Sequence, residues 1–157
     1  MDTAAAEAQM MSLANHYADA INRANFDDLV DCWAPDGIWR IPQPVEYAEF
    51  VGRDAIKERL AGRRAYVDIV VMLVGSVVAV SISDDRILGR TTIAEYGRID
   101  AAQGLNVLGL YDDELIHLDG RWVYARRELN MLAFTDEAST YSRGTNRYAP
   151  PEPLGNH

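Results

Sequence analysis

The chain has 157 residues, 48% of them hydrophobic, which suits one compact domain with a sizeable core and argues against a second domain. Its 15 Lys and Arg residues against 24 Asp and Glu residues give a net charge of -9, which repels nucleic-acid phosphates and anionic lipid headgroups. The first twenty residues hold no Lys or Arg, and no apolar run reaches membrane-spanning length, so we expect a cytoplasmic protein. The single cysteine, Cys32, excludes an internal disulfide and is expected to be a core or boundary residue.

An amphipathic helix is predicted near the N-terminus, because apolar residues recur there at spacings of three and four: Met10, Leu13, Tyr17, Ala20 and Ile21. A second, short helix is predicted from Phe26 to Trp33, ended by the Ala-Pro-Asp-Gly sequence of residues 34–37. Residues 38–41 predict a short strand. Residues 42–51 contain two prolines and scattered acids, which favours a loop or flap.

A third helix is predicted after Gly52, with Asp54 as its cap and the basic residues 63–64 placed to suit the helix dipole. The chain from Val67 to Ser83 is almost continuously apolar and rich in valine. This composition predicts a long buried strand, or two strands bent at Gly75.

Two strands joined by a tight turn are predicted for residues 109–127, after a strand over residues 87–99. The turn is Asp119-Gly120, a dipeptide that tolerates the positive φ of a two-residue hairpin. Strand residues alternate between faces, so one face is predicted to carry Gly109, Tyr111, Asp113, Leu115 and His117. On the partner strand the same alternation separates Trp122, Tyr124, Arg126 and Glu128 from Val123, Ala125, Arg127 and Leu129.

These elements predict an α+β domain in which three helices pack on one face of a curved sheet of four or five long antiparallel strands. We expect residues 1–134 to form this domain. Residues 135–157 are rich in Ser, Thr, Gly and Pro and predict a partly irregular extension that wraps the domain or reaches a neighbour.

Three local signatures, in this order along the chain, resemble the SnoaL-like branch of the nuclear transport factor 2-like superfamily. They are YADAIN at 17–22 with NFD at 25–27, APDGIW at 34–39 with GRDAI at 52–56, and YDDELIHLDGRWVYARR at 111–127. The resemblance spans roughly residues 13–132 and implies a cone-shaped, cystatin-like fold with a hydrophobic pocket at its wide end, and dimers or trimers. The hairpin is most similar to the group that contains scytalone dehydratase and hexachlorocyclohexane dehydrochlorinase.

The dehydratase-type members of this family rely on a His and Asp pair as the base that removes a proton. At the matching positions this chain has Met72 and Asn22, which cannot act as a base at neutral pH. The resemblance therefore does not carry the family mechanism over. It does imply a substrate-binding wall that includes Trp39 and Tyr111 together with Asn22 and Met72, and it places Arg127 on the final strand.

Four residues are candidate catalytic groups: Asp113, Glu95, Tyr17 and Arg127. Asp113 and Arg127 either form a structural ion pair or take part in catalysis, because a buried charge needs a partner. Glu95 is a candidate base if it faces the cavity, and an edge charge if it faces outward. Tyr17 either donates a hydrogen bond to a substrate oxygen or is a core residue with a satisfied hydroxyl.

We expect a cofactor-free lyase, isomerase or cyclase that uses general acid/base chemistry on a hydrophobic small molecule of polyketide, steroid or terpenoid type. The alternatives are a noncatalytic binding protein of the same fold and a β-subunit-like partner of an oxygenase. No metal site is expected, because the three histidines are far apart and Asp112 and Asp113 alternate across a strand. A homodimer or homotrimer is expected, because the apolar run of residues 67–80 is hard to cover within one small domain.

Overall fold

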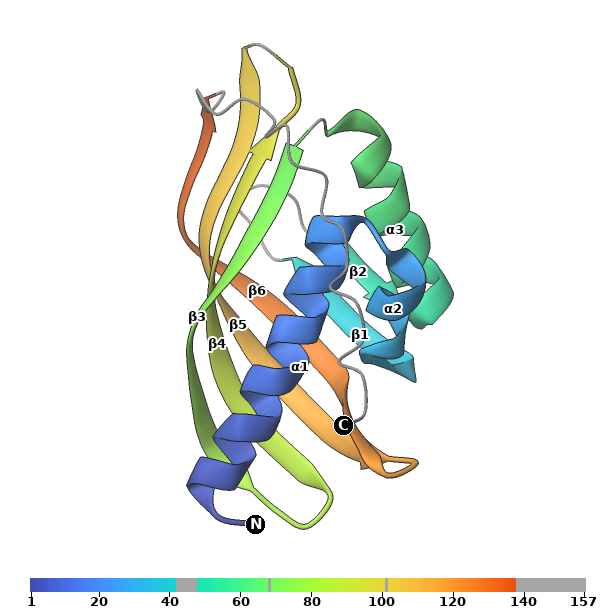
Figure 1. The fold of residues 1–157 in the computed structure, drawn as a ribbon, viewed down its shortest axis with the longest axis vertical. Coiled ribbons are helices and arrows are strands. Elements are labelled where there is room, and N and C mark those ends of the chain that lie inside the picture. Colours follow the sequence, from blue (N-terminus) through green and yellow to red (C-terminus); the bar gives the residue numbers. More distant parts are fainter. Residues whose placement is uncertain (42–47, 68, 101, 138–157) are drawn as a thin grey trace, which may run out of the picture.

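The computed structural model describes residues 1–41, 48–67, 69–100 and 102–137. They form, in chain order, α1 (Thr3–Arg23), α2 (Phe26–Asp31), β1 (Trp33–Ile41), β2 (Ala48–Val51), α3 (Arg53–Tyr66), β3 (Ile69–Ile82), β4 (Arg86–Arg98), β5 (Gln103–Leu118) and β6 (Arg121–Glu137). Figure 1 shows the helices on one side of a strongly curved sheet. The predicted α+β fold is confirmed. Within the described ranges, no helix is both long and apolar enough to cross a lipid bilayer.

The sheet is mixed rather than purely antiparallel. Its six strands lie in the order β2-β1-β6-β5-β4-β3. Every neighbouring pair is antiparallel except β1 and β6, which run parallel. The parallel pair joins a strand from the N-terminal third of the chain to the last described strand, so strands that are distant in sequence are neighbours in the sheet.

Helix α1 has the predicted amphipathic pattern. The side chains of Met10, Leu13, Tyr17 and Ile21 are buried, and the helix lies against β3 on the inner face of the sheet. Asp2 caps the helix by accepting a hydrogen bond from the Ala5 backbone amide at 2.7 Å. One face of α1 therefore forms part of the wall around the interior of the cone.

The prediction that the second helix runs to Trp33 and is ended by residues 34–37 is wrong. Helix α2 ends at Asp31, and β1 begins at Trp33, which pairs with Tyr124 of β6. A register shift between Trp33 and Ile38 takes up the proline and glycine that lie between them. Gly37 is required there, because a Cβ atom would lie 2.9 Å from the Trp33 ring.

Part of the predicted loop over residues 42–51 is a strand. Residues 48–51 form β2, which pairs with β1, whereas residues 42–47 lie outside the described residues. The predicted cap at Asp54 is also wrong, because α3 begins after Gly52, which has a φ of +87°, and no side chain caps it. Asp54 lies in the first turn, where its charge still suits the helix dipole.

The predicted hairpin is formed by β5 and β6. Asp119 and Gly120 both have positive φ, +51° and +80°, as a type I′ turn requires. Gly109, Tyr111, Asp113 and Leu115 face the interior as predicted, but His117 is exposed. The predicted extension beyond residue 134 begins inside β6, and residues 138–157 lie outside the described part of the chain.

Alternation on β6 fails at Ala125, one of the places where its register with β5 shifts. Arg126 pairs with Glu114, and Tyr124 pairs with Leu115, so Ala125 is an extra residue in the strand. This bulge places both Tyr124 and Arg127 on the inner face, whereas the period-two pattern predicted opposite faces. Both side chains are buried, and their contact is part of the candidate site.

Candidate active site

An apolar cavity lies between α1, α3 and the inner face of the sheet. Its volume is about 80 Å³ and it is open to solvent, so a molecule larger than a few waters binds there by extending out of the cavity or by displacing wall side chains. Ionisable and aromatic groups on its wall are Tyr17, Trp39, Arg59, Arg63, Glu95 and Tyr111, and the other lining residues are Ile21, Ile41, Leu60, Met72, Ile93, Leu105, Val107, Leu129 and Met131. A mostly apolar hollow with a few converging polar groups is the usual form of a small-molecule site.

Glu95 faces this cavity, which selects the first of the two orientations considered from the sequence. It lies on β4 directly opposite Met72 of β3, and the residue is 7% exposed. Its Oε1 accepts a hydrogen bond from Nη2 of Arg63 on α3. The carboxylate is thus held inside an apolar wall by one charged partner.

Arg63 was not predicted as a site residue, since its position near the helix end suggested only an interaction with the helix dipole. Burial lowers its pKa, but the contact with Glu95 more than offsets this, so the pKa is raised. The guanidinium therefore stays charged. The residue spacing in this helix could have indicated that Arg63 faces the interior, because Ile56, Leu60 and Arg63 follow the three-and-four pattern of one helix face.

The positions that match the family Asp and His lie side by side. Asn22 Nδ2 donates to the Met72 carbonyl at 3.0 Å, and the Met72 amide donates to Asn22 Oδ1 at 2.7 Å. The Asn22 amide thus joins the end of α1 to β3 and uses both its donor and its acceptor. The Met72 side chain lines the cavity as expected, whereas Asn22 is not one of the residues that line it.

Asp113 and Arg127 form a sealed ion pair that does not line the cavity. Arg127 Nε donates to Asp113 Oδ1 at 2.7 Å, Arg127 Nη2 donates to Oδ2 at 3.3 Å, and Thr91 Oγ1 donates to Oδ2 at 2.7 Å. The two side chains are 0–1% exposed. This geometry supports the structural alternative for the pair, because protein atoms occupy both carboxylate oxygens.

Three tyrosine rings surround the Arg127 guanidinium. Its central carbon lies 3.9 Å from the Tyr111 ring centroid, 4.1 Å from that of Tyr124 and 4.7 Å from that of Tyr17. Burial lowers the pKa of Arg127, but Asp113 and the tyrosines more than offset it. Since Tyr17 and Tyr111 also line the cavity, the buried cation lies directly against two of its wall residues.

Burial keeps these tyrosines protonated. It raises the pKa of Tyr111 to about 12, although the nearby Arg127 charge acts in the opposite direction. The pKa values of Tyr17 and Tyr124 are raised well above the ordinary value for the same reason. Tyr17 and Tyr111 are therefore suited to donate hydrogen bonds rather than to accept a proton.

We expect the free energy of unfolding to fall as the pH rises above 10. Unfolded tyrosines ionise near pH 10.0, whereas folded Tyr111 holds its proton to about 12, so the folded state binds more protons in this interval. Stability from this shift is complete below pH 10 and is lost as the pH rises through 12. Urea unfolding at stepped pH, followed by tyrosinate absorbance, measures it. A Tyr111→Phe variant should show a shallower fall, and an equal slope would contradict this account.

Trp39 lies where the resemblance implied. It is buried, lines the cavity and packs on Phe50 of β2 with ring centroids 5.5 Å apart. Because Trp39 lies on β1, the parallel pairing of β1 with β6 is what brings this ring to the cavity.

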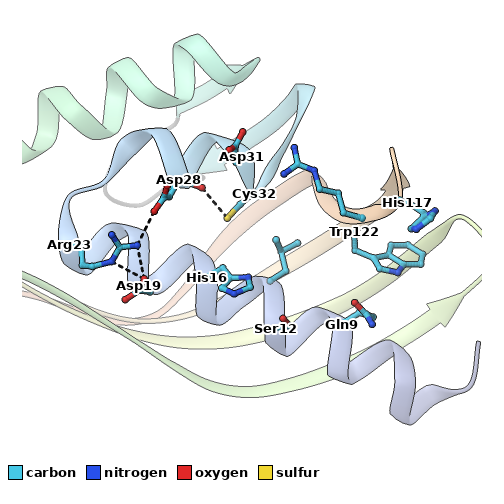
Figure 2. Close-up of a pocket in the computed structure, with 13 residues that line it drawn as sticks. Gln9, Ser12, His16, Asp19, Arg23, Asp28, Asp31, Cys32, His117 and Trp122 are labelled. Atoms are coloured by element: carbon cyan, nitrogen blue, oxygen red, sulfur yellow. Dashed lines mark hydrogen bonds and ion pairs between the residues drawn. The ribbon is translucent and has the colours of Figure 1, made fainter. Parts of the chain in front are cut away.

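A second hollow lies outside, between α1, α2 and the β5–β6 turn. It is larger, about 630 Å³, and Figure 2 shows His16, Cys32 and Trp122 around it. Its charges are largely paired with one another, since Arg23 bridges Asp19 and Asp28. Burial raises the pKa of the Cys32 thiol to about 11, so it is not a nucleophile at neutral pH. In the described part of the chain, no three His, Cys, Asp or Glu residues are grouped to hold a metal ion.

The curved sheet with helices on its inner face and an apolar cavity between them defines the nuclear transport factor 2-like fold. The family model described as a SnoaL-like domain matches residues 2–128, so the chain belongs to the SnoaL-like family. The chain matches no curated protein sequence.

Solved structures share this fold at low sequence identity. A candidate scytalone dehydratase from Novosphingobium aromaticivorans DSM 12444 is 20% identical, with a TM-score of 0.72 over 90% of this chain and 93% of the other. A type 2 LinA hexachlorocyclohexane dehydrochlorinase is 18% identical, with a TM-score of 0.72 over 94% and 95%. The β subunit of a candidate aromatic-ring-hydroxylating dioxygenase from N. aromaticivorans is 12% identical, with a TM-score of 0.67 over 81% and 89%.

Proposed function

We propose that this protein is a cofactor-free lyase, isomerase or cyclase that moves a proton on a largely apolar small molecule of polyketide, steroid or terpenoid type. The observation that carries the proposal is Glu95, a carboxylate that lines an otherwise mostly apolar cavity. Two structural neighbours are named as a dehydratase and a dehydrochlorinase, names that denote eliminations, which supports this class of reaction.

In this proposal Glu95 accepts the substrate proton. The apolar wall limits the contact of the carboxylate with water, and Arg63 holds the carboxylate at the cavity before a ligand binds. Tyr17 and Tyr111, which stay protonated, donate hydrogen bonds to a substrate oxygen on which negative charge develops. Arg127 stabilises that charge from behind the rings without touching the substrate.

A thermal-shift screen of polycyclic phenols, steroids, terpenoid epoxides and lactones tests this function. Each stabilising compound is incubated with the protein and analysed by mass spectrometry and chiral chromatography. Conversion would establish an enzyme and name its reaction class. Binding without conversion across the pH range would refute the catalytic proposal.

A noncatalytic small-molecule-binding protein is the second candidate. It is favoured by the Asn22 amide, which hydrogen-bonds the Met72 backbone where the family has its acid/base pair. A β-subunit-like role beside an oxygenase is a third candidate, suggested by the dioxygenase β subunit among the structural neighbours. Copurification of the full chain with a larger oxygenase subunit would favour that role.

We also propose that the protein self-associates through the outer face of its sheet, as a homodimer or homotrimer. Exposed apolar side chains gather there, including Val71 and Leu73 of β3, Leu88 of β4 and Leu108 of β5. Light scattering after size exclusion should give a dimer or trimer for the wild type, and a smaller species for a Leu73→Glu, Leu108→Glu variant. Tyr66→Glu, an exposed apolar site on α3, is the matched control. A monomeric wild type would contradict this proposal.

A further inference from the structure

Among the described residues, two largely buried Arg–carboxylate pairs differ in what they can do. In the Asp113–Arg127 pair, three hydrogen bonds from protein groups hold the carboxylate, and no side chain of the pair is more than 1% exposed. In the Glu95–Arg63 pair, the side chains are 9% and 20% exposed, and both line the cavity. A bound molecule can therefore reach the second pair and not the first.

Arg63 and Glu95 reach the cavity from different elements of the fold. Arg63 lies on α3, which packs on α2, β1 and β2, whereas Glu95 lies in the middle of the large sheet. The guanidinium presents several N–H donors in one plane, a geometry that matches the two oxygens of a carboxylate. Arg59, one turn earlier on α3, lies over the Phe50 ring and lines the same cavity.

We infer that the cavity binds molecules that combine an apolar or aromatic body with one anionic oxygen group, a carboxylate or phenolate, which takes the Arg63 guanidinium from Glu95. The apolar body occupies the part of the cavity walled by Ile93, Val107 and Leu129. The assignment deepens the proposed function and rests on it for the chemical step after binding, in which Glu95, released from its ion pair, accepts the substrate proton.

Competition between the ligand and Glu95 for the Arg63 guanidinium predicts the direction in which the affinity for anionic ligands should change. Removing the Glu95 charge removes the competitor, so anionic ligands should bind more tightly to Glu95→Gln than to the wild type. If Glu95 only repelled anions, Glu95→Gln would also bind anionic ligands more tightly, but the preference for anions would not depend on Arg63. A second variant that also lacks the Arg63 charge is therefore needed.

Isothermal titration calorimetry with benzoate and its neutral isostere benzamide tests this assignment. We expect the wild type to prefer benzoate by about tenfold. Glu95→Gln should strengthen benzoate binding by about another tenfold and change benzamide binding by less than about twofold. Arg63→Gln alone would leave Glu95 buried without this partner, so the Arg63→Gln, Glu95→Gln double variant is used, with circular dichroism and Tm as folding controls. It should lose the preference for benzoate.

Equal affinity of the wild type for the two probes, including no binding of either, would overturn the assignment. Weaker benzoate binding to Glu95→Gln, or a preference that survives in the double variant, would also overturn it. The readout is binding, so it is separable from turnover. Benzoate preference without conversion of any screened compound would remove the proposed catalysis and leave the anion site, whereas conversion of neutral compounds without benzoate preference would do the reverse.

Discussion

Glu95→Gln is expected to lower kcat by about 100- to 10,000-fold on any substrate that the wild type converts, because a glutamine amide cannot accept the proton. The amide has nearly the same shape as the carboxylate and can still accept a hydrogen bond from Arg63, so the fold should persist. Steady-state kinetics with a substrate found by the screen measure the effect. Circular dichroism should show an unchanged spectrum.

A matched control is Glu114→Gln. Glu114 lies on the outer face of β5, where it pairs with Arg86, and the two side chains are partly exposed. Its loss should leave kcat unchanged. A folded Glu95→Gln protein with wild-type kcat would remove Glu95 from the mechanism.

Asp113→Ala is expected to reduce the free energy of unfolding by about 3–5 kcal/mol, because it leaves the Arg127 charge buried without its anion. The same change also removes the acceptor for the Thr91 hydroxyl. Since small domains are stable by about 5–15 kcal/mol, this is a large share of the total. Chemical denaturation in urea measures it.

The neighbouring Asp112→Ala is the control for this loss. Asp112 points to the other face of β5, is exposed and accepts a hydrogen bond from Asn130 at 2.8 Å, so its removal should cost about 1 kcal/mol or less. An Asp113→Leu, Arg127→Met double variant should regain most of the lost stability, because it removes both charges together. If Asp113→Ala were no worse than Asp112→Ala, the pair would not have the structural role assigned to it.

The hairpin is the element that the sequence predicts best, and it also shows where prediction stops. Its turn dipeptide and alternation correctly give the strands, the turn and the inward positions of Tyr111 and Asp113. The bulge at Ala125 has no such signal, since an alanine fits either register. That one residue decides whether Tyr124 shares a face with Arg127, so the tyrosine enclosure of Arg127 could not be predicted.

The cavity shows the same division between local and long-range information. Position within a strand limits Glu95 to one of two faces, and the structure selects the inner one. Its partner Arg63 is on a helix, and no local pattern says which strand that helix will face. Likewise, Trp39 reaches the cavity only through the parallel pairing of β1 with β6, and periodicity alone does not predict pairing between distant segments.

That pairing also sets the order in which the protein can fold as it is synthesised. Strand β1 is made early, but its neighbour in the sheet centre, β6, is made last among the described strands. At about 5–20 residues per second, the roughly eighty residues between them take on the order of 4–16 seconds to emerge. During that interval the backbone of β1 lacks its central neighbour and the ring of Trp39 lacks its cavity, so the cavity and its candidate site residues come together only when β6 arrives.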